Sequence, residues 1–195
     1  MNGSKFISEP VVSGTAPSNL AITVALAKTY LEIDASDTHY DALVQDAIEA
    51  ATIEAQNATG LQLSRASFIG YLSAWPSLVR VSLPPLVSVT SVKYYDATNT
   101  LSSAIDASNY AVSPNLTPGI ITFSSEFSQP ALYDRPDAIE ITFVAGYESY
   151  SAIPADIRKG VRLLVWNEFE FRKNGVREKT TEADIIFAQY KGSGL

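Results

Sequence analysis

The sequence of 195 residues lacks cysteine entirely and contains only one histidine and one methionine. Without cysteine there is neither a disulfide framework nor a thiolate metal ligand, and one histidine is too few for an ordinary transition-metal site. The ten glycines form no GxGxxG pattern and no glycine-rich phosphate loop, and no Asp-x-Asp-x-Asp-Gly calcium loop occurs. We therefore expect no metal and no cofactor.

Long apolar runs are also missing. The stretch 21–27 is the most apolar part of the N-terminal region, and Lys28 interrupts it well short of the length of a membrane span. The N-terminus shows no secretion signal, so no membrane partner is expected. An apolar content of 46% with 18% charged residues is typical of a folded globular protein, either one domain or a domain with an inserted lobe.

Catalytic constellations are scarce. His39 lies near Ser36 and Asp41, and the sequence leaves open a Ser-His-carboxylate triad, although a solvated histidine at a helix end is the more common situation. Glu168 and Glu170 point to different faces of one predicted helix and make a poor acid–base pair. We predict no catalytic residue and expect a protein that is not an enzyme.

The net charge of −7 is distributed unevenly. Residues 1–154 carry 6 Lys and Arg against 15 Asp and Glu, whereas residues 155–195 carry 8 against 6. The stretch 32–54 holds seven acids and no Lys or Arg. A chain that grips DNA phosphates would show the opposite sign, so sequence-specific nucleic-acid binding is not expected. The acidic run could collect cations, form a solvated face or pair with basic residues.

An N-terminal arm precedes the first predicted helix. Residues 1–19 are rich in Ser, Gly, Pro and Asn, with one apolar patch at Val11 and Val12. This composition predicts a flexible arm that orders on contact with a partner. Thr23 can then cap a short helix over about 23–31.

A longer second helix is predicted over about 38–59. Its apolar residues follow the spacing of a buried stripe, and small side chains among them allow another helix to approach closely. Thr38 and Asp41 have the spacing of a capping box at its start, and Gly60 can supply its stop.

The periodicity then changes from helical to alternating, which predicts a β lobe over about 66–146. Six short strands are expected within it, at 68–72, 79–83, 87–95, 110–112, 119–123 and 138–144. The predicted fold class is α+β: a small α-helical bundle, of two N-terminal helices and a long C-terminal helix, with the β-strand lobe inserted between the second and third helices.

The long C-terminal helix is predicted over 154–173. Pro154 and Asp156 suit its first turn. Its apolar residues spread around most of the circumference, so it must be covered on more than one side, by its own domain or by a neighbouring subunit. We expect Leu164 and Val165 to face the second helix. Trp166 and Phe169 are expected to face outward, to a neighbouring subunit or to the β lobe.

The tail, residues 174–195, contains one more helical signal. Thr181 and Asp184 form a second capping box, which starts a short helix over about 182–190. A helix this short is marginal by itself, so it docks either on its own domain or on a partner.

Several blocks in this order and spacing resemble the head–tail connector (adaptor) family of long-tailed double-stranded-DNA phages and gene transfer agents. The blocks are 22–34, the helix 40–60, 83–96, 110–112, 139–147 and 153–172. The most specific parts are a Pro-Pro-Leu block followed by Ser-Val-Thr-Ser-Val, at 84–92, and an Ile-Pro-x-x-Ile-Arg helix start at 153–158.

The resemblance implies a structural protein at the head–tail junction of the virion, made in the host cytoplasm. Family members form a homo-oligomeric ring, usually twelve-fold, under the portal protein and above the next neck or tail protein. Genomic DNA passes through the ring without sequence-specific binding. The arm 1–19 and the large β region depart from shorter members of the family.

Three groups of residues follow as hypotheses within this resemblance. Subunit-interface residues are Trp166, Phe169, Arg158, Arg162 and Arg172. Channel-lining acids are Asp41, Asp46 and Glu49. Residues docking on the portal are Ile185, Ile186, Phe187 and Tyr190. The alternatives are another neck or tail-terminator ring protein and a β-rich host-binding module.

Overall fold

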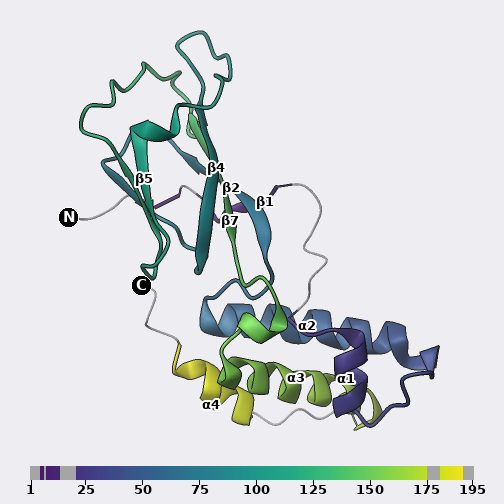
Figure 1. The fold of residues 1–195 in the computed structure, drawn as a ribbon. Helices are drawn as coiled ribbons and strands as arrows, with labels where there is room; N and C mark the ends of the chain where they lie inside the picture. Colours follow the sequence, from purple (N-terminus) through teal and green to yellow (C-terminus); the bar gives the residue numbers. More distant parts are fainter. Residues whose placement is uncertain (1–4, 7, 14–20, 175–180, 191–195) are drawn as a thin grey trace. The chain divides into compact units, whose positions relative to one another are not determined.

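A computed structural model of the chain describes residues 5–6, 8–13, 21–174 and 181–190, with the backbone alone at 171–174. The chain divides into two compact units, which are considered separately below (Figure 1). The β unit contains residues 66–146 and the described residues before position 14; the helical unit contains the described residues of 17–65 and 147–193. The fold is α+β, with four α-helices and two antiparallel sheets among the described residues.

The β unit consists of two sheets in which every pairing is antiparallel. The first sheet has the order β1 (Val11–Val12), β2 (Ala66–Leu72), β7 (Ile139–Ala145), β4 (Leu86–Tyr94). The second has the order β3 (Leu78–Arg80), β6 (Ile120–Phe123), β5 (Tyr110–Ser113), and a short 3-10 helix, η2 (Ala107–Asn109), leads into β5.

Alternation of buried and half-buried side chains runs the full length of β2 and β7, as expected for strands with one face against a core. Phe68 of β2 stacks on Phe143 of β7, with ring centroids 5.8 Å apart. Trp75, between β2 and β3, packs edge-on against Phe123 and Phe127 and donates its Nε1 hydrogen to the Pro130 carbonyl at 3.0 Å. This tryptophan is therefore held against the core of the β unit.

The described residues of the predicted N-terminal arm lie against the first sheet. Val11 and Val12 pair with β2, and Phe6 stacks on Phe143 with ring centroids 5.6 Å apart. Gly70 makes room for this ring, because a Cβ built there would lie 2.4 Å from Phe6. Phe6, Val11 and Val12 thus contact the first sheet within the chain, which the polar composition of the arm did not predict.

The helical unit contains four α-helices and two 3-10 helices within its described residues. In chain order they are α1 (Val24–Tyr30), η1 (Thr38–Tyr40), α2 (Asp41–Thr59), η3 (Tyr150–Ala152), α3 (Ala155–Asn174) and α4 (Glu182–Ala188). Helices α2 and α3 lie side by side (Figure 1). Their shared core joins Ile48 and Ala51 of α2 to Ile157, Val161 and Leu164 of α3. Within the described residues, no helix is both long and apolar enough to cross a membrane.

Three helix ends have the chemistry that the sequence predicts. The Thr23 hydroxyl accepts a hydrogen bond from the Leu26 amide at the start of α1. Gly60 ends α2 with a φ of 71°, in the left-handed region. Thr181 and Asp184 form a complete capping box at α4, and this prediction is confirmed.

The capping box predicted for the second helix, by contrast, is wrong. Residues 38–40 form the 3-10 helix η1, so α2 begins at Asp41 instead of Thr38. The side chain that caps this turn is Asp37, which accepts from the His39 amide. The Asp41 carboxylate instead binds Lys28, at 2.8 Å.

Candidate functional site

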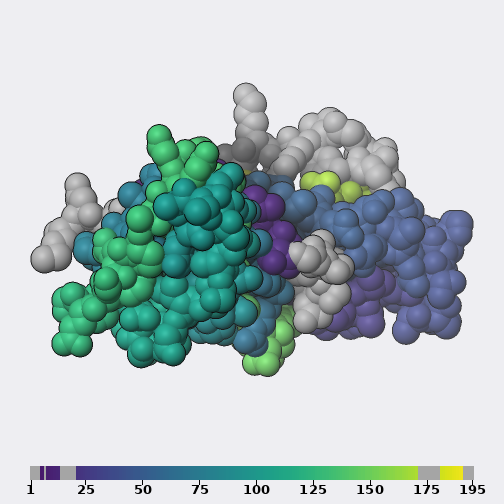
Figure 2. All heavy atoms as spheres, turned by 90° about the horizontal axis from the view of Figure 1, so that it is seen from above, coloured from purple at the N-terminus to yellow at the C-terminus, as the bar shows by residue number. Residues whose placement is uncertain are grey.

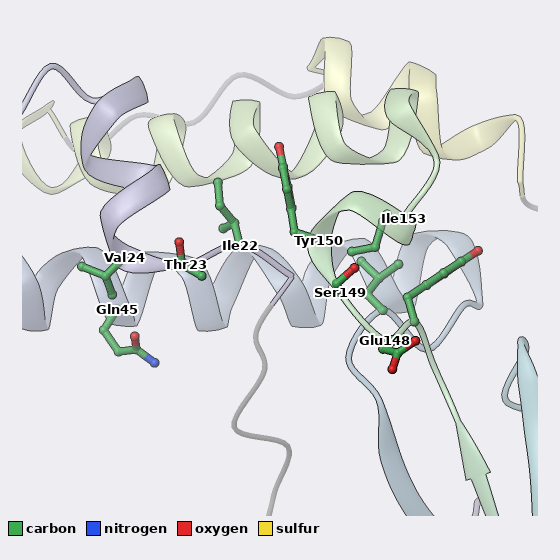
Figure 3. A pocket seen from close by; sticks show the side chains of 10 residues that line it. Ile22, Thr23, Val24, Gln45, Glu148, Ser149, Tyr150 and Ile153 are labelled. Atoms are coloured by element: carbon green, nitrogen blue, oxygen red, sulfur yellow. The ribbon is translucent and has the colours of Figure 1, made fainter.

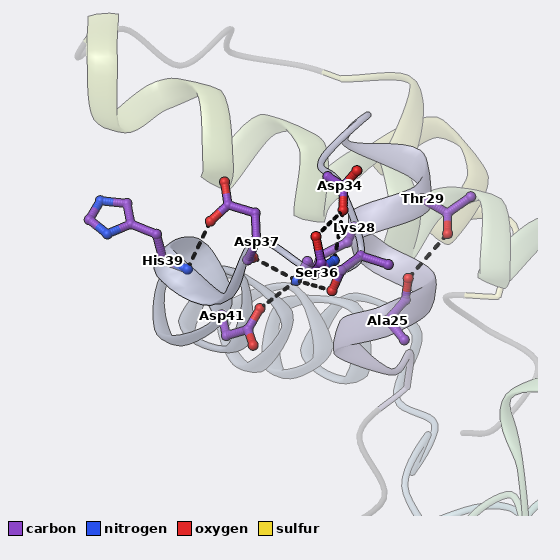
Figure 4. A network of polar contacts seen from close by, with 9 residues as sticks. Ala25, Lys28, Thr29, Asp34, Ser36, Asp37, His39 and Asp41 are labelled. Atoms are coloured by element: carbon purple, nitrogen blue, oxygen red, sulfur yellow. Dashed lines mark hydrogen bonds and ion pairs between the residues drawn. The ribbon is translucent and has the colours of Figure 1, made fainter.

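Lys28 is the best-enclosed charged side chain among the described residues of the helical unit, with 3% of the residue exposed. Its ammonium group donates to the Ala35 carbonyl at 3.1 Å, the Asp37 carbonyl at 2.7 Å and the Asp41 carboxylate at 2.8 Å (Figure 4). Three acceptors match the three N–H donors of a lysine ammonium. This network joins α1 to the loop before α2. It also pairs Asp41, one of the three acids predicted to line a channel, with Lys28.

The residues of the possible triad are not arranged for nucleophilic catalysis. The Ser36 hydroxyl donates to Asp34 at 2.6 Å, and His39 contributes its backbone amide, not its ring, to Asp37. Figure 4 shows the imidazole of His39 pointing away from Ser36. The Ser36 bonds lower the pKa of Asp34 below its usual value, as expected of a loop that satisfies its own carboxylate. Among the described residues, no group of three or more histidines and carboxylates could hold a metal ion.

Arg162 of α3 lies at the centre of a cluster of arginine and tyrosine side chains. Its Nη1 group donates to the Tyr150 hydroxyl at 3.0 Å and to the Tyr30 hydroxyl at 3.2 Å. Its guanidinium also stacks 4.7 Å from the centroid of the Tyr30 ring, and that of Arg158 lies 5.3 Å from the Tyr150 ring. Burial raises the pKa of Tyr150, so the phenol stays neutral and the cluster keeps the positive charge of both arginines.

Neither arginine has a carboxylate partner among the described residues. The Nε of Arg158 is also buried and makes no hydrogen bond within the described part of the chain. A guanidinium with unused donors, beside a second guanidinium, is a site that can accept an acidic side chain. The sequence predicted an interface role for both arginines, and the structure brings them together.

Trp166 continues this arrangement along α3. Positions 158, 162 and 166 are spaced by four residues and therefore lie on one side of the helix. Trp166 is 52% exposed, a large fraction for a tryptophan. We call Arg158, Arg162 and Trp166 the cationic stripe.

The other two predicted interface residues do not extend the stripe. Phe169 is buried, and its ring meets Tyr40 edge-on with centroids 6.0 Å apart, because η1 covers this side of α3. The prediction that it faces outward, like Trp166, does not hold within the chain. The Arg172 side chain lies outside the described residues.

The side of α2 opposite its core is acidic and partly apolar. Asp46 and Glu49 are exposed there, together with Leu43 (43% exposed) and Ile53 (57%). Glu49 accepts a hydrogen bond from Gln45, at 2.9 Å. Helix α2 (blue in Figure 2) contributes to the surface of the helical unit. We call Leu43, Asp46, Glu49 and Ile53 the acidic face; it holds the two predicted channel acids that make no ion pair within the described residues.

The four residues predicted to dock on a portal divide between the inside and the outside of the helical unit. Phe187 is buried against Gly160 of α3, and Ile186 packs on the same core. Tyr190 donates a hydrogen bond to Asp156. Ile185 projects furthest into solvent of the four, 61% exposed. Helix α4 therefore belongs to the unit and presents Ile185 on its outer side.

A cleft of about 470 Å³ opens beside Tyr150, within the helical unit (Figure 3). It lies between the start of α1, Gln45 of α2 and the segment 147–153. Its walls combine aliphatic and neutral polar side chains, with Glu148 among them, where Arg65 approaches it at 3.5 Å. This lining contains no pair of groups suited to acid–base chemistry.

The roles of several residues near this site are not apparent from the sequence. Tyr30 and Tyr150 are far apart in the chain, so their meeting at Arg162 depends on the packing of α1 and η3 against α3. Leu43 matched the predicted buried stripe of the second helix but is exposed. Lys28 follows an apolar run, and only the loop after α1 reveals its burial.

No protein-family model and no curated protein matches the chain. Solved structures do match. A chain in the neck of an empty gene transfer agent (GTA) particle, computed with C6 symmetry, superposes with a TM-score of 0.76 at 22% identity, covering 92% of this chain and 93% of that one. A chain in the virion of a native GTA particle gives 0.75 at 21% identity, with 94% and 95% covered. A chain in the neck of a native GTA particle, computed with C12 symmetry, gives 0.68 at 21% identity, with 93% of each chain covered. These likenesses show a shared fold over nearly the whole chain.

Proposed function

We propose that this chain is a structural protein of a virion neck, in which copies form a ring under the portal that joins the head to the tail and extends the DNA channel. The observation that carries the proposal is the fold shared with chains of GTA necks over 92% or more of both partners. Those necks were computed with C6 and C12 symmetry, which supports a closed ring of identical contacts. The ring proposed for this protein contains twelve copies of the chain.

The arrangement of the chain fits this role. Residues 66–146 form one compact unit together with the described residues before position 14, and the chain belongs to the helical unit directly before position 66 and directly after position 146. This division supports the predicted fold, a helical bundle with an inserted β lobe. In the ring, the cationic stripe contacts a neighbouring subunit, and Ile185 on α4 contacts the portal. Genomic DNA passes through without sequence-specific binding.

Particles from a strain that produces this protein provide the test. We expect an epitope-tagged chain to co-purify with the particles, and electron microscopy with an antibody to place the tag at the head–tail junction. Deleting the gene should give DNA-filled heads without tails. Absence of the chain from purified particles, or normal particles after deletion, would refute the proposal.

The same preparation distinguishes the alternatives. A tail-terminator protein would be found on isolated tails instead of isolated heads. A host-binding module would bind cells as a free protein and leave assembled particles intact after deletion.

A further inference from the structure

The helical unit displays two surfaces of opposite charge, and each exposes at least one large apolar side chain. The cationic stripe on α3 combines two arginines that lack a carboxylate partner among the described residues with the half-exposed Trp166. The acidic face on α2 combines two exposed carboxylates with Leu43 and Ile53. Arginine and aromatic residues are enriched at protein–protein contacts, so the cationic stripe has the composition of such a contact.

We propose that the cationic stripe of one copy docks on the acidic face of α2 of the next copy, head to tail. The occupant of each surface is a second copy of this chain. Because the two surfaces are different parts of the molecule, the contact is heterologous; repeating it gives a closed ring when the rotation between copies divides a full turn, and an open filament otherwise. This inference rests on the proposed neck function only for the closure of that ring; the pairwise contact stands by itself.

The dimensions of the two surfaces agree. From Arg158 to Trp166 the stripe extends about 12 Å along α3, at about 1.5 Å per residue. The whole acidic face extends about 15 Å along α2; its two carboxylates with Ile53 extend about 10 Å, and with Leu43 about 9 Å. Two helices packed side by side can then place both arginines against the two carboxylates and Trp166 against an aliphatic end. That end is Ile53 if the helices run in the same direction and Leu43 if they run in opposite directions.

The chemistry of each surface also suits the other. Arginine forms paired hydrogen bonds with carboxylates, and the tyrosines that hold Arg162 fix its guanidinium before the partner arrives. Tryptophan and arginine are among the residues that most often dominate binding energy at interfaces.

The alternative occupant of the acidic face is DNA in the channel, which carboxylates would repel and so keep mobile. Repulsion needs exposed acids alone, and it gives no reason for Leu43 and Ile53 to project beside them. A neighbouring subunit accounts for both the acids and the aliphatic side chains. The acidic face is therefore assigned to the subunit contact.

The natural absence of cysteine makes disulfide trapping a direct test. Chains carrying Trp166→Cys are mixed with chains carrying Ile53→Cys or Leu43→Cys and oxidised, both as purified protein and in particles that contain the chain. We expect one of the two mixtures to give a disulfide-linked dimer on a non-reducing gel, and each variant alone to give none. If neither mixture is linked in either preparation, or if Trp166→Cys links only to itself, the head-to-tail contact is wrong.

Charge reversal gives a second readout on exposed side chains. Asp46→Lys should weaken self-association about tenfold, measured by sedimentation, and the effect should shrink at high salt. Asp134→Lys makes the same substitution at an exposed residue of the β unit and should leave association unchanged. If Asp46→Lys behaves like this control while slowing DNA ejection from particles, the face lines the channel and the inference falls.

The two proposals can fail separately. Trapped dimers of a chain that is absent from particles would refute the neck function and leave the contact standing. A chain found in the neck without either disulfide would refute the contact alone.

Discussion

At the scale of single residues, Lys28 combines burial with three hydrogen bonds from its side chain. Its ammonium group donates to three oxygen atoms, and only 3% of the residue is exposed. Lys28→Met keeps most of the length of the side chain but leaves the Ala35 and Asp37 carbonyls and the Asp41 carboxylate without their donor. We expect the free energy of unfolding to fall by about 3 kcal/mol, measured by urea titration of the helical circular dichroism signal.

Lys5→Met is the matched control for Lys28→Met, because Lys5 is exposed. It should change the free energy of unfolding by less than about 0.5 kcal/mol. Equal stability of the Lys28→Met variant and the parent chain would show that the network adds nothing to the fold.

The hydrogen bond from Tyr190 to Asp156 makes stability depend on pH. It lowers the pKa of Asp156, whose stabilising effect is present above the unfolded value of about 3.9 and is lost as the pH falls through the lower folded value. Burial, together with Asp156, raises the pKa of Tyr190 to about 12, so its effect is present below the unfolded value of about 10 and is lost as the pH rises towards 12.

Tyr190→Phe tests this pH dependence. The difference in unfolding free energy between the parent chain and the variant should be largest near neutral pH and should decline at both extremes. A difference that stays constant from acid to alkali would show that Tyr190 stabilises α4 by packing alone.

The helix ends show how much of the structure local chemistry determines. The caps at Thr23, Gly60 and Thr181 depend on residues within four positions, and they form as predicted. The box at Thr38 does not form, and Asp41 is bound by Lys28, which lies on another element. Sequence pattern predicts an element well when its interactions are local and poorly when a partner comes from another element.

The same distinction applies to the faces of the helices. Trp166 and Phe169 are grouped as outward-facing in the sequence because α3 is apolar around most of its circumference. They differ in the structure because Tyr40 of η1 covers Phe169 and leaves Trp166 half exposed. Helical spacing predicts which residues share a side, but the neighbouring element decides which side is covered.

The contact between α3 and α4 depends on a glycine. A Cβ at Gly160 would lie 2.5 Å from the Phe187 ring, so this ring must move if any side chain is introduced. Gly160→Ala should therefore destabilise the helical unit, even though alanine is more favourable than glycine in a helix interior by about 1 kcal/mol. The measurement is the thermal midpoint of the helical signal.

Adding Phe187→Leu to Gly160→Ala should recover part of the loss, because the smaller side chain frees space at the contact. Asn57→Ala, at an exposed position of α2, is the control for helix propensity and should be neutral or slightly stabilising. If Gly160→Ala proves as stabilising as this control, α4 does not depend on the close approach.

For the whole molecule, composition predicted a basic C-terminal region and an acidic remainder, but not the surfaces that result. Charge sums cannot show that Lys28 neutralises Asp41, that Lys159 pairs with Glu182, or that two arginines of α3 lie beside aromatic rings. Those pairings leave a few charges available to partners. The proposed assembly depends on these charges, and they become identifiable only when the chain is folded.

The proposed attachment to the portal involves the whole molecule, and one side chain can test it. Removing residues 181–195 would also remove Ala183 and Phe187 from the core of the helical unit, so a failure of the truncated chain would have two explanations.

Ile185→Glu changes only a side chain that is 61% exposed and should leave the fold intact. We expect this variant to stay as stable as the parent chain but to bind purified portal-bearing heads at least about tenfold more weakly, because a charge would be buried without a partner at the contact. Leu116→Glu, an equally polar change at an exposed residue of the β unit, should bind normally. Normal binding of Ile185→Glu would instead mean that α4 serves only its own unit and that the portal contact lies elsewhere on the chain.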